Sequence, residues 1–88
     1  MKTDSKTKMA YGLTVSYTEG KVTADAVSQA AMARKYETGR GCVVNGTSFN
    51  CDVGFVFTDA VKRMDTIVRI KLALCSKVRF ERYEYVDL

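Results

Sequence analysis

The residues that could carry catalytic or metal-binding chemistry are few in this chain. It contains three cysteines, Cys42, Cys51 and Cys75, and no histidine. Activation of a nucleophile by a Ser–His or Cys–His pair is therefore unavailable. A structural zinc site needs four ligands at characteristic spacing, and the three cysteines form no CxxC pair. We therefore predict that the chain is not an enzyme and that it holds no metal and no cofactor.

Phosphate-binding and acid–base chemistry have equally little support. Gly39-Arg40-Gly41 lacks the lysine and the Ser/Thr of a phosphate-binding loop. The carboxylates are scattered among the predicted elements, and no two of them can be placed across a cleft. We therefore expect the function of the chain to reside in a binding surface.

The cysteines are predicted to be buried, reduced thiols. Asn45-Gly46 between two apolar runs is a strong hairpin signal, because both central residues of a type I′ turn need φ > 0. With that turn, Cys42 lies opposite Phe49 and Cys51 lies opposite Arg40. A disulfide between Cys42 and Cys51 requires the hairpin to shift by one pairing step, and this is the less favoured alternative.

The elements around this hairpin follow from the spacing of apolar residues. Met9–Thr18 alternates as a half-buried strand, and Thr23 caps a helix that runs to about Glu37, with Gly39 as the glycine that ends it. The second hairpin strand places an alternating set on the core side: Phe49, Cys51, Val53, Phe55 and Phe57. Val78–Val86 is a final strand whose other face, away from Val78 and Phe80, carries Arg79, Glu81, Tyr83 and Tyr85, unless a β-bulge reverses its second half.

The segment Thr58–Cys75 fits two structures. As a helix it begins with a Thr58-Asp59 cap and has an apolar face at three- and four-residue steps: Val61, Met64, Ile67, Val68, Leu72 and Cys75. Lys71 and Arg63 interrupt this face, and Ile70 lies outside its centre. As a strand, residues 68–74 alternate without a break. The cap and the helix-forming residues favour the helix.

The order strand, helix, strand, strand, helix, strand resembles the ferredoxin-like βαββαβ unit. That resemblance implies an α+β fold with an antiparallel sheet and both helices on one face. It is architectural, covers residues 9–86 and brings no functional motif. Residues 1–8 are predicted to be a flexible tail and residues 9–88 a single domain. If the second helix is a strand, the alternative is a single helix on a five-stranded antiparallel meander.

The heptapeptide Cys51–Phe57 is similar to a degraded RNA-recognition-motif signature, which Gly54, Phe55 and Val56 match. In that family Val53 and Phe55 would face solvent to stack bases, and Asp52 would face the helices. Burying an unpaired carboxylate costs about 3–5 kcal/mol. We therefore predict that Phe49, Phe55 and Phe57 belong to the core and that this strand has no base-stacking platform.

The net charge of +4 is concentrated after residue 61. Residues 62–82 include seven Lys and Arg residues but only two acidic residues, Asp65 and Glu81. This excess favours an acidic protein face or a polyanion, although an ordinary solvated surface is the simpler alternative. Tyrosine and arginine are enriched in interface hot spots. The candidate binding surface is therefore Lys62, Arg63, Arg69, Lys71, Arg79, Arg82, Tyr83 and Tyr85.

The leading functional hypothesis is a non-enzymatic binding or inhibitor module that acts on a protein partner. Small proteins of this size and charge resemble phage-encoded accessory proteins that inhibit host defence or nucleic-acid machinery, by size and class alone. One alternative is direct RNA or DNA binding, and another is a homo-oligomeric structural protein joined through the open sheet face or the edge strand Cys42–Val44. No apolar run approaches the ~20 residues of a membrane span and no signal-peptide pattern opens the chain, so a cytoplasmic location is expected.

Overall fold

The computed structural model describes residues 8–18, 20 and 22–87. The elements are β1 (Lys8–Thr18), α1 (Ala24–Ala31), β2 (Glu37–Asn45), β3 (Ser48–Phe57), α2 (Ala60–Leu74) and β4 (Val78–Asp87). Two short 3-10 turns, η2 (Arg34–Tyr36) and η3 (Cys75–Lys77), precede β2 and β4. The predicted tail lies outside the described residues except for Lys8, which begins β1.

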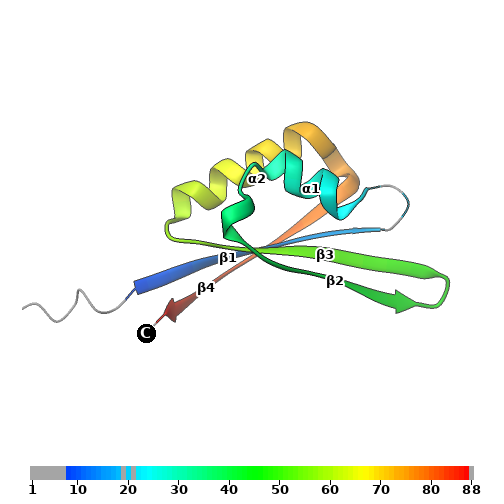
Figure 1. The fold of residues 1–88 in the computed structure, drawn as a ribbon, viewed down its shortest axis with the longest axis horizontal. Coiled ribbons are helices and arrows are strands. Elements are labelled where there is room, and N and C mark those ends of the chain that lie inside the picture. Colours follow the sequence, from blue (N-terminus) through cyan, green and yellow to red (C-terminus); the bar gives the residue numbers. More distant parts are fainter. Residues whose placement is uncertain (1–7, 19, 21, 88) are drawn as a thin grey trace, which may run out of the picture.

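The four strands form one antiparallel sheet in the order β2-β3-β1-β4. β1 and β2, which α1 connects, lie on either side of β3, and β3 and β4, which α2 connects, lie on either side of β1. These are two interleaved split βαβ units. Both helices cover the same face of the sheet, and the other face is open (Figure 1). The ferredoxin-like α+β prediction is confirmed, and residues 66–74 are helical.

The core lies between the helices and the two central strands. Its largest fully buried side chains include Phe55, Phe57, Leu13 and Ile70. Phe49 was predicted to join them, but it is 47% exposed, so that prediction is wrong. The β2–β3 hairpin extends past the helices (Figure 1), and Phe49 lies at the start of β3 in this uncovered end. Alternation identifies the face of a strand, but it does not show how far a helix covers that face.

α1 begins where the sequence predicts and ends earlier. The Thr23 hydroxyl accepts a hydrogen bond from the Ala26 backbone N–H (3.1 Å), as an N-cap does. The helix ends at Ala31, and its C-cap residue Met32 has a left-handed φ of 52°, so the predicted end near Glu37 with Gly39 is wrong. The early end lets Ala33 enter the core and brings the Tyr36 ring 5.1 Å from the Phe57 ring. Tertiary packing overrides the helix preference of this Ala/Arg/Lys segment.

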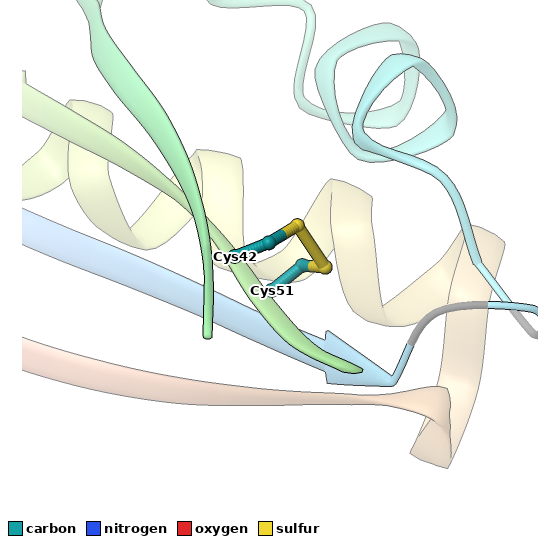
Figure 2. Close-up of a disulfide and its surroundings, with 2 residues drawn as sticks. All are labelled: Cys42 and Cys51. Carbon is teal, nitrogen blue, oxygen red and sulfur yellow. A yellow bond between two sulfur atoms is a disulfide. The ribbon is translucent and has the colours of Figure 1, made fainter. Parts of the chain in front are cut away.

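The β2–β3 hairpin has a different register from the predicted one. Asn45 pairs with Ser48, so the loop is Gly46-Thr47, and Gly46 has a φ of 67°. Glycine at the first loop position is the preference of a type II′ turn. This register places Cys42 opposite Cys51, and the two form a disulfide between neighbouring strands (Figure 2). The prediction that all three cysteines are buried thiols is therefore wrong, and the free Cys75 is exposed.

Candidate protein-binding surface

α2 turns a strongly apolar face away from the core. Asp59 caps the helix by accepting a hydrogen bond from the Lys62 backbone N–H at 2.8 Å. Four large apolar side chains at steps of three and four residues, which we call the α2 stripe, are exposed to solvent: Val61 (69%), Met64 (47%), Val68 (47%) and Leu72 (79%). Large exposed apolar patches mark interaction sites on soluble proteins. The α2 stripe is therefore the strongest candidate site in the described part of the chain.

The predicted apolar face of α2 is wrong in its orientation. Of the residues assigned to that face, only Ile67 is buried, and Cys75 is exposed together with the α2 stripe. The buried residues of the helix are Arg63, Thr66, Ile67 and Ile70. Arg63 and Ile70, which interrupt the periodic pattern or lie off its centre, are thus the ones that contact the core.

Arg63 explains this rotation of α2. Its side chain is 10% exposed, and its guanidinium donates hydrogen bonds to the backbone carbonyls of Gly12 (3.3 Å) and Tyr83 (3.0 Å). The same group pairs with Glu84 at 2.7 Å and lies 5.4 Å from the centre of the Tyr11 ring. A buried guanidinium is tolerated only where such partners satisfy it. Arg63 therefore anchors α2 to β1 and β4, and it is not available to a binding partner.

The other residues of the predicted binding surface do not form one surface. Arg69 lies toward α1, where its Nε donates a hydrogen bond to the carbonyl of Ala31 at 2.9 Å. Lys62 lines a hollow on the same side of α2 together with Arg69, and its Nζ lies 4.0 Å from the Asp59 carboxylate. Arg69 thus binds the last carbonyl of α1, which is a structural role.

Lys71 and Arg82 meet on the opposite side of α2. They line a groove of about 350 Å³ between α2 and β4, together with Met64, Ile67 and Phe80. The Lys71 Nζ lies 5.9 Å from the centre of the Phe80 ring. Because Met64 belongs to both features, the groove continues the α2 stripe. The stripe therefore has a basic border on the side of β4.

Arg79, Tyr83 and Tyr85 lie on the open face of the sheet, as β4 alternation predicts. The two tyrosine rings are stacked, with centroids 6.2 Å apart and planes inclined by 13°. The Tyr83 ring covers Gly12, its neighbour on β1, and leaves no room for a Cβ atom at residue 12. An aromatic ring that covers a glycine on the neighbouring strand also protects that strand's backbone.

The central strands give this open face no base-stacking platform. Its central residues on β1 and β3 are Gly12, Thr14, Gly54 and Val56, and Asp52 is half-buried on the same face opposite Ser16. Phe55, which the RNA-recognition signature would place on this face, is fully buried on the other. The prediction that Phe55 and Phe57 belong to the core is confirmed, and the absence of base stacking on β3 stays a prediction.

A polar network at the β2 edge has a structural role. Glu37 accepts hydrogen bonds from Arg40 Nε (2.6 Å) and from the Ser28 hydroxyl (2.7 Å), and Arg40 also pairs with Asp25 at 3.0 Å. The hydrogen bond from Arg40, aided by Ser28, holds the pKa of Glu37 below its ordinary value. The hydrogen bonds that Arg40 donates to Glu37 and to Asp25 raise the pKa of Arg40. The network connects β2 to α1, and its charged groups are already paired within the chain.

Comparison with known proteins assigns no family. Among the described residues, no group of three or more His, Cys, Asp or Glu side chains is placed to hold a metal ion. In that same part of the chain, no helix combines the length and the apolar character that crossing a membrane requires. No protein-family model matches the chain, and no curated protein matches its sequence. The exposed surface of the chain is therefore what points to a function.

Proposed function

We propose that the chain is a non-enzymatic binding module that docks on a partner protein through the α2 stripe. The observation that supports this is the exposure of Val61, Met64, Val68 and Leu72 on one face of a single helix. Burying a Val, Leu or Met side chain is worth about 1.5–3 kcal/mol. The unbound chain forfeits most of this free energy at Val61 and Leu72 and about half of it at Met64 and Val68, and a bound partner recovers it.

The border of the α2 stripe indicates the chemistry of the partner. Lys71 and Arg82 lie beside the α2 stripe, in the groove between α2 and β4. The acidic residue of α2 is Asp65. A partner with an apolar strip edged by aspartate or glutamate matches this arrangement. Covering a working surface of such a partner would inhibit it without any catalysis by this chain. We therefore propose that the chain acts as a small inhibitor of this kind, such as a phage accessory protein.

Direct binding of single-stranded RNA or DNA is the second candidate. The stacked pair Tyr83 and Tyr85, on the same face of β4 as Arg79, supports it, because exposed aromatic rings stack on bases of any sequence. Asp52 and Glu81 share that open face, and their negative charge opposes phosphate binding. Anisotropy titration of a labelled oligonucleotide at several salt concentrations tests this function. Affinity that falls steeply with salt supports it, and no binding at low salt removes it.

The cytoplasmic location expected from the sequence stays a prediction. The Cys42–Cys51 disulfide weighs against it, since cytosolic thiols are normally kept reduced and persistent disulfides are typical of oxidising compartments. Thiol trapping of the protein in intact cells measures which form is present where the chain acts.

Two matched variants test the proposed docking surface. Val61 on the stripe and Val43 on β2 are the same residue with nearly the same exposure, 69% and 64%. A partner captured from nuclease-treated host extract is purified and titrated against wild type, Val61→Asp and Val43→Asp. We expect Val61→Asp to weaken binding by about tenfold or more, because it places a charge in an apolar contact, and Val43→Asp to leave it unchanged. Equal binding by all three proteins would contradict the proposal.

A further inference from the structure

β4 is a long and regular edge of the sheet. Among the described strands it pairs only with β1, over ten consecutive positions from Val78 to Asp87 with no register shift. Natural edge strands usually discourage pairing with bulges, glycine, proline or unmatched charges. β4 has the sequence VRFERYEYVD, with neither glycine nor proline. Its charged side chains therefore determine which strand can pair with this edge.

These charges are complementary to a second copy of the same strand. In an antiparallel pairing centred on Tyr83, Arg82 lies opposite Glu84 of the second copy, and Phe80 lies opposite Val86 of the second copy. Tyr83 lies opposite itself, and Glu81 lies opposite Tyr85, whose phenol can donate a hydrogen bond to the carboxylate. Each unlike pair occurs twice because of the two-fold symmetry. Opposite charges and aromatic or β-branched neighbours across antiparallel strands are stabilising.

Neighbouring registers are disfavoured. Moving the centre by one residue places Arg82 against itself or Glu84 against itself, and like charges directly opposite are destabilising. A slip by one residue, which would pair Tyr83 with Arg82, would place residues of the helix side opposite residues of the open face. The sequence of β4 therefore selects the register centred on Tyr83.

The same pairing covers apolar surface on the helix side of the sheet. Phe80 and Arg82 lie opposite Val15 and Leu13 of β1, so they face the helices, where they line the α2–β4 groove. Val86 on this side is 49% exposed, and its β1 neighbour Met9 is 41% exposed. A second copy brings its Val86 against Phe80 at the groove and receives Phe80 against its own Val86.

We propose that two copies of this chain pair through β4 to form a continuous eight-stranded antiparallel sheet. Strands about 4.8 Å apart across the junction keep the sheet unbroken, and the two α2 helices lie on the same face. The pairing does not depend on partner binding, so it goes beyond the proposed function. It also displays two α2 stripes on one side of a single particle.

Charge exchange between two variants tests the register. Sedimentation equilibrium of the full chain is expected to give twice the 9.8 kDa chain mass. Arg82→Glu and Glu84→Arg, measured separately, are each expected to weaken the dimer by about tenfold or more, because each creates two like-charge pairs. Their equimolar mixture restores opposite charges and the dimer, whereas Lys35→Glu, on η2 away from β4, leaves the dimer unchanged. A wild-type mass of 9.8 kDa at every concentration overturns the proposal, as does a mixture no more dimeric than its components.

Cross-linking gives a second readout, because Glu84→Arg also breaks the ion pair with Arg63. Directly opposed antiparallel residues have Cα atoms about 4.5–5.5 Å apart, within the range of a disulfide. In a Cys75→Ser background, Tyr83→Cys is expected to form a covalent dimer under mild oxidation, and Tyr85→Cys, which faces Glu81 of the second copy, is not. Equal cross-linking of the two variants, or none in either, counts against a pairing centred on Tyr83.

Discussion

The two faces of α2 differ from those of an ordinary surface helix, because polar side chains are buried on the inner face and large apolar side chains are exposed on the outer face. The inner face buries an arginine and a threonine, Arg63 and Thr66, beside Ile67 and Ile70. The outer face carries the α2 stripe, whose four large apolar side chains are 47–79% exposed. A surface helix normally turns its apolar stripe toward the core. Apolar content alone therefore does not decide which face of a helix is buried.

Two local facts make the inner face favourable. Arg63 finds two backbone carbonyls and a carboxylate on β1 and β4, and the Thr66 hydroxyl donates a hydrogen bond to the Lys62 carbonyl at 2.9 Å within its own helix. Every buried polar group on this face is thereby satisfied, which removes the penalty of burial. The outer face has no corresponding structural reason to be apolar, and the proposed docking function would supply one.

The largest expected effect comes from truncating the inner face. Ile70→Ala removes a fully buried side chain, and we expect it to lower the free energy of unfolding by about 3–4 kcal/mol. Leu72→Ala, two residues further and 79% exposed, is expected to change it by less than about 0.5 kcal/mol. Urea denaturation of both variants measures the difference. Similar losses from the two variants would mean that the two faces are not distinct.

Replacing Arg63 is expected to lower the free energy of unfolding slightly less than Ile70→Ala does. Arg63→Met leaves the carbonyls of Gly12 and Tyr83 and the half-exposed Glu84 without their partner, which we expect to cost about 2–3 kcal/mol. Lys62→Met, the adjacent exposed position, serves as the control and should cost less than about 0.5 kcal/mol. If Arg63→Met were as stable as wild type in urea, the hydrogen bonds and the ion pair of the guanidinium would not explain the orientation of α2.

Reduction of the disulfide tests whether the hairpin contributes to stability independently of α2. The bridge closes a short loop at the β2–β3 hairpin, and its loss is expected to cost about 2 kcal/mol. The hairpin lies away from α2, so reduction should lower the stability of wild type and of Leu72→Ala by the same amount. Thermal melts with and without a reductant measure both losses. A Cys75→Ser variant that responds to reductant as wild type does assigns the effect to Cys42 and Cys51.

The smallest expected effect concerns pH and the Glu37 network. Because hydrogen bonds from Arg40 and Ser28 lower the pKa of Glu37 in the folded state, the stabilisation is complete above its ordinary pKa. It is lost as the pH falls from that value through the lower folded pKa. Glu37→Gln should remove this part of the acid decline and cost less than about 1 kcal/mol at neutral pH. Urea midpoints of wild type and Glu37→Gln, measured over the same pH series, test this.

Local patterns in the sequence were sufficient for much of the fold. Alternation in Met9–Thr18 and in Val78–Val86 predicts β1 and β4 and the face of each residue, and the caps at Thr23 and Asp59 predict both helix starts. These features depend on neighbours in the chain and on the 2.0 and 3.6 residue periods. The candidate surface was predicted less well, because Arg63 and Arg69, two of its charged residues, have partners within the chain.

Tertiary structure decided the hairpin register, the end of α1 and the rotation of α2. Two registers of the hairpin differ by one pairing step and have similar local turn chemistry, so contacts across the sheet choose between them. The rotation of α2 depends on partners that lie 51 and 20 residues from Arg63, at Gly12 and Tyr83. An apolar period reports where a helix can bury a face, but only the assembled sheet supplies the groups that let an arginine occupy the core and leave the α2 stripe exposed.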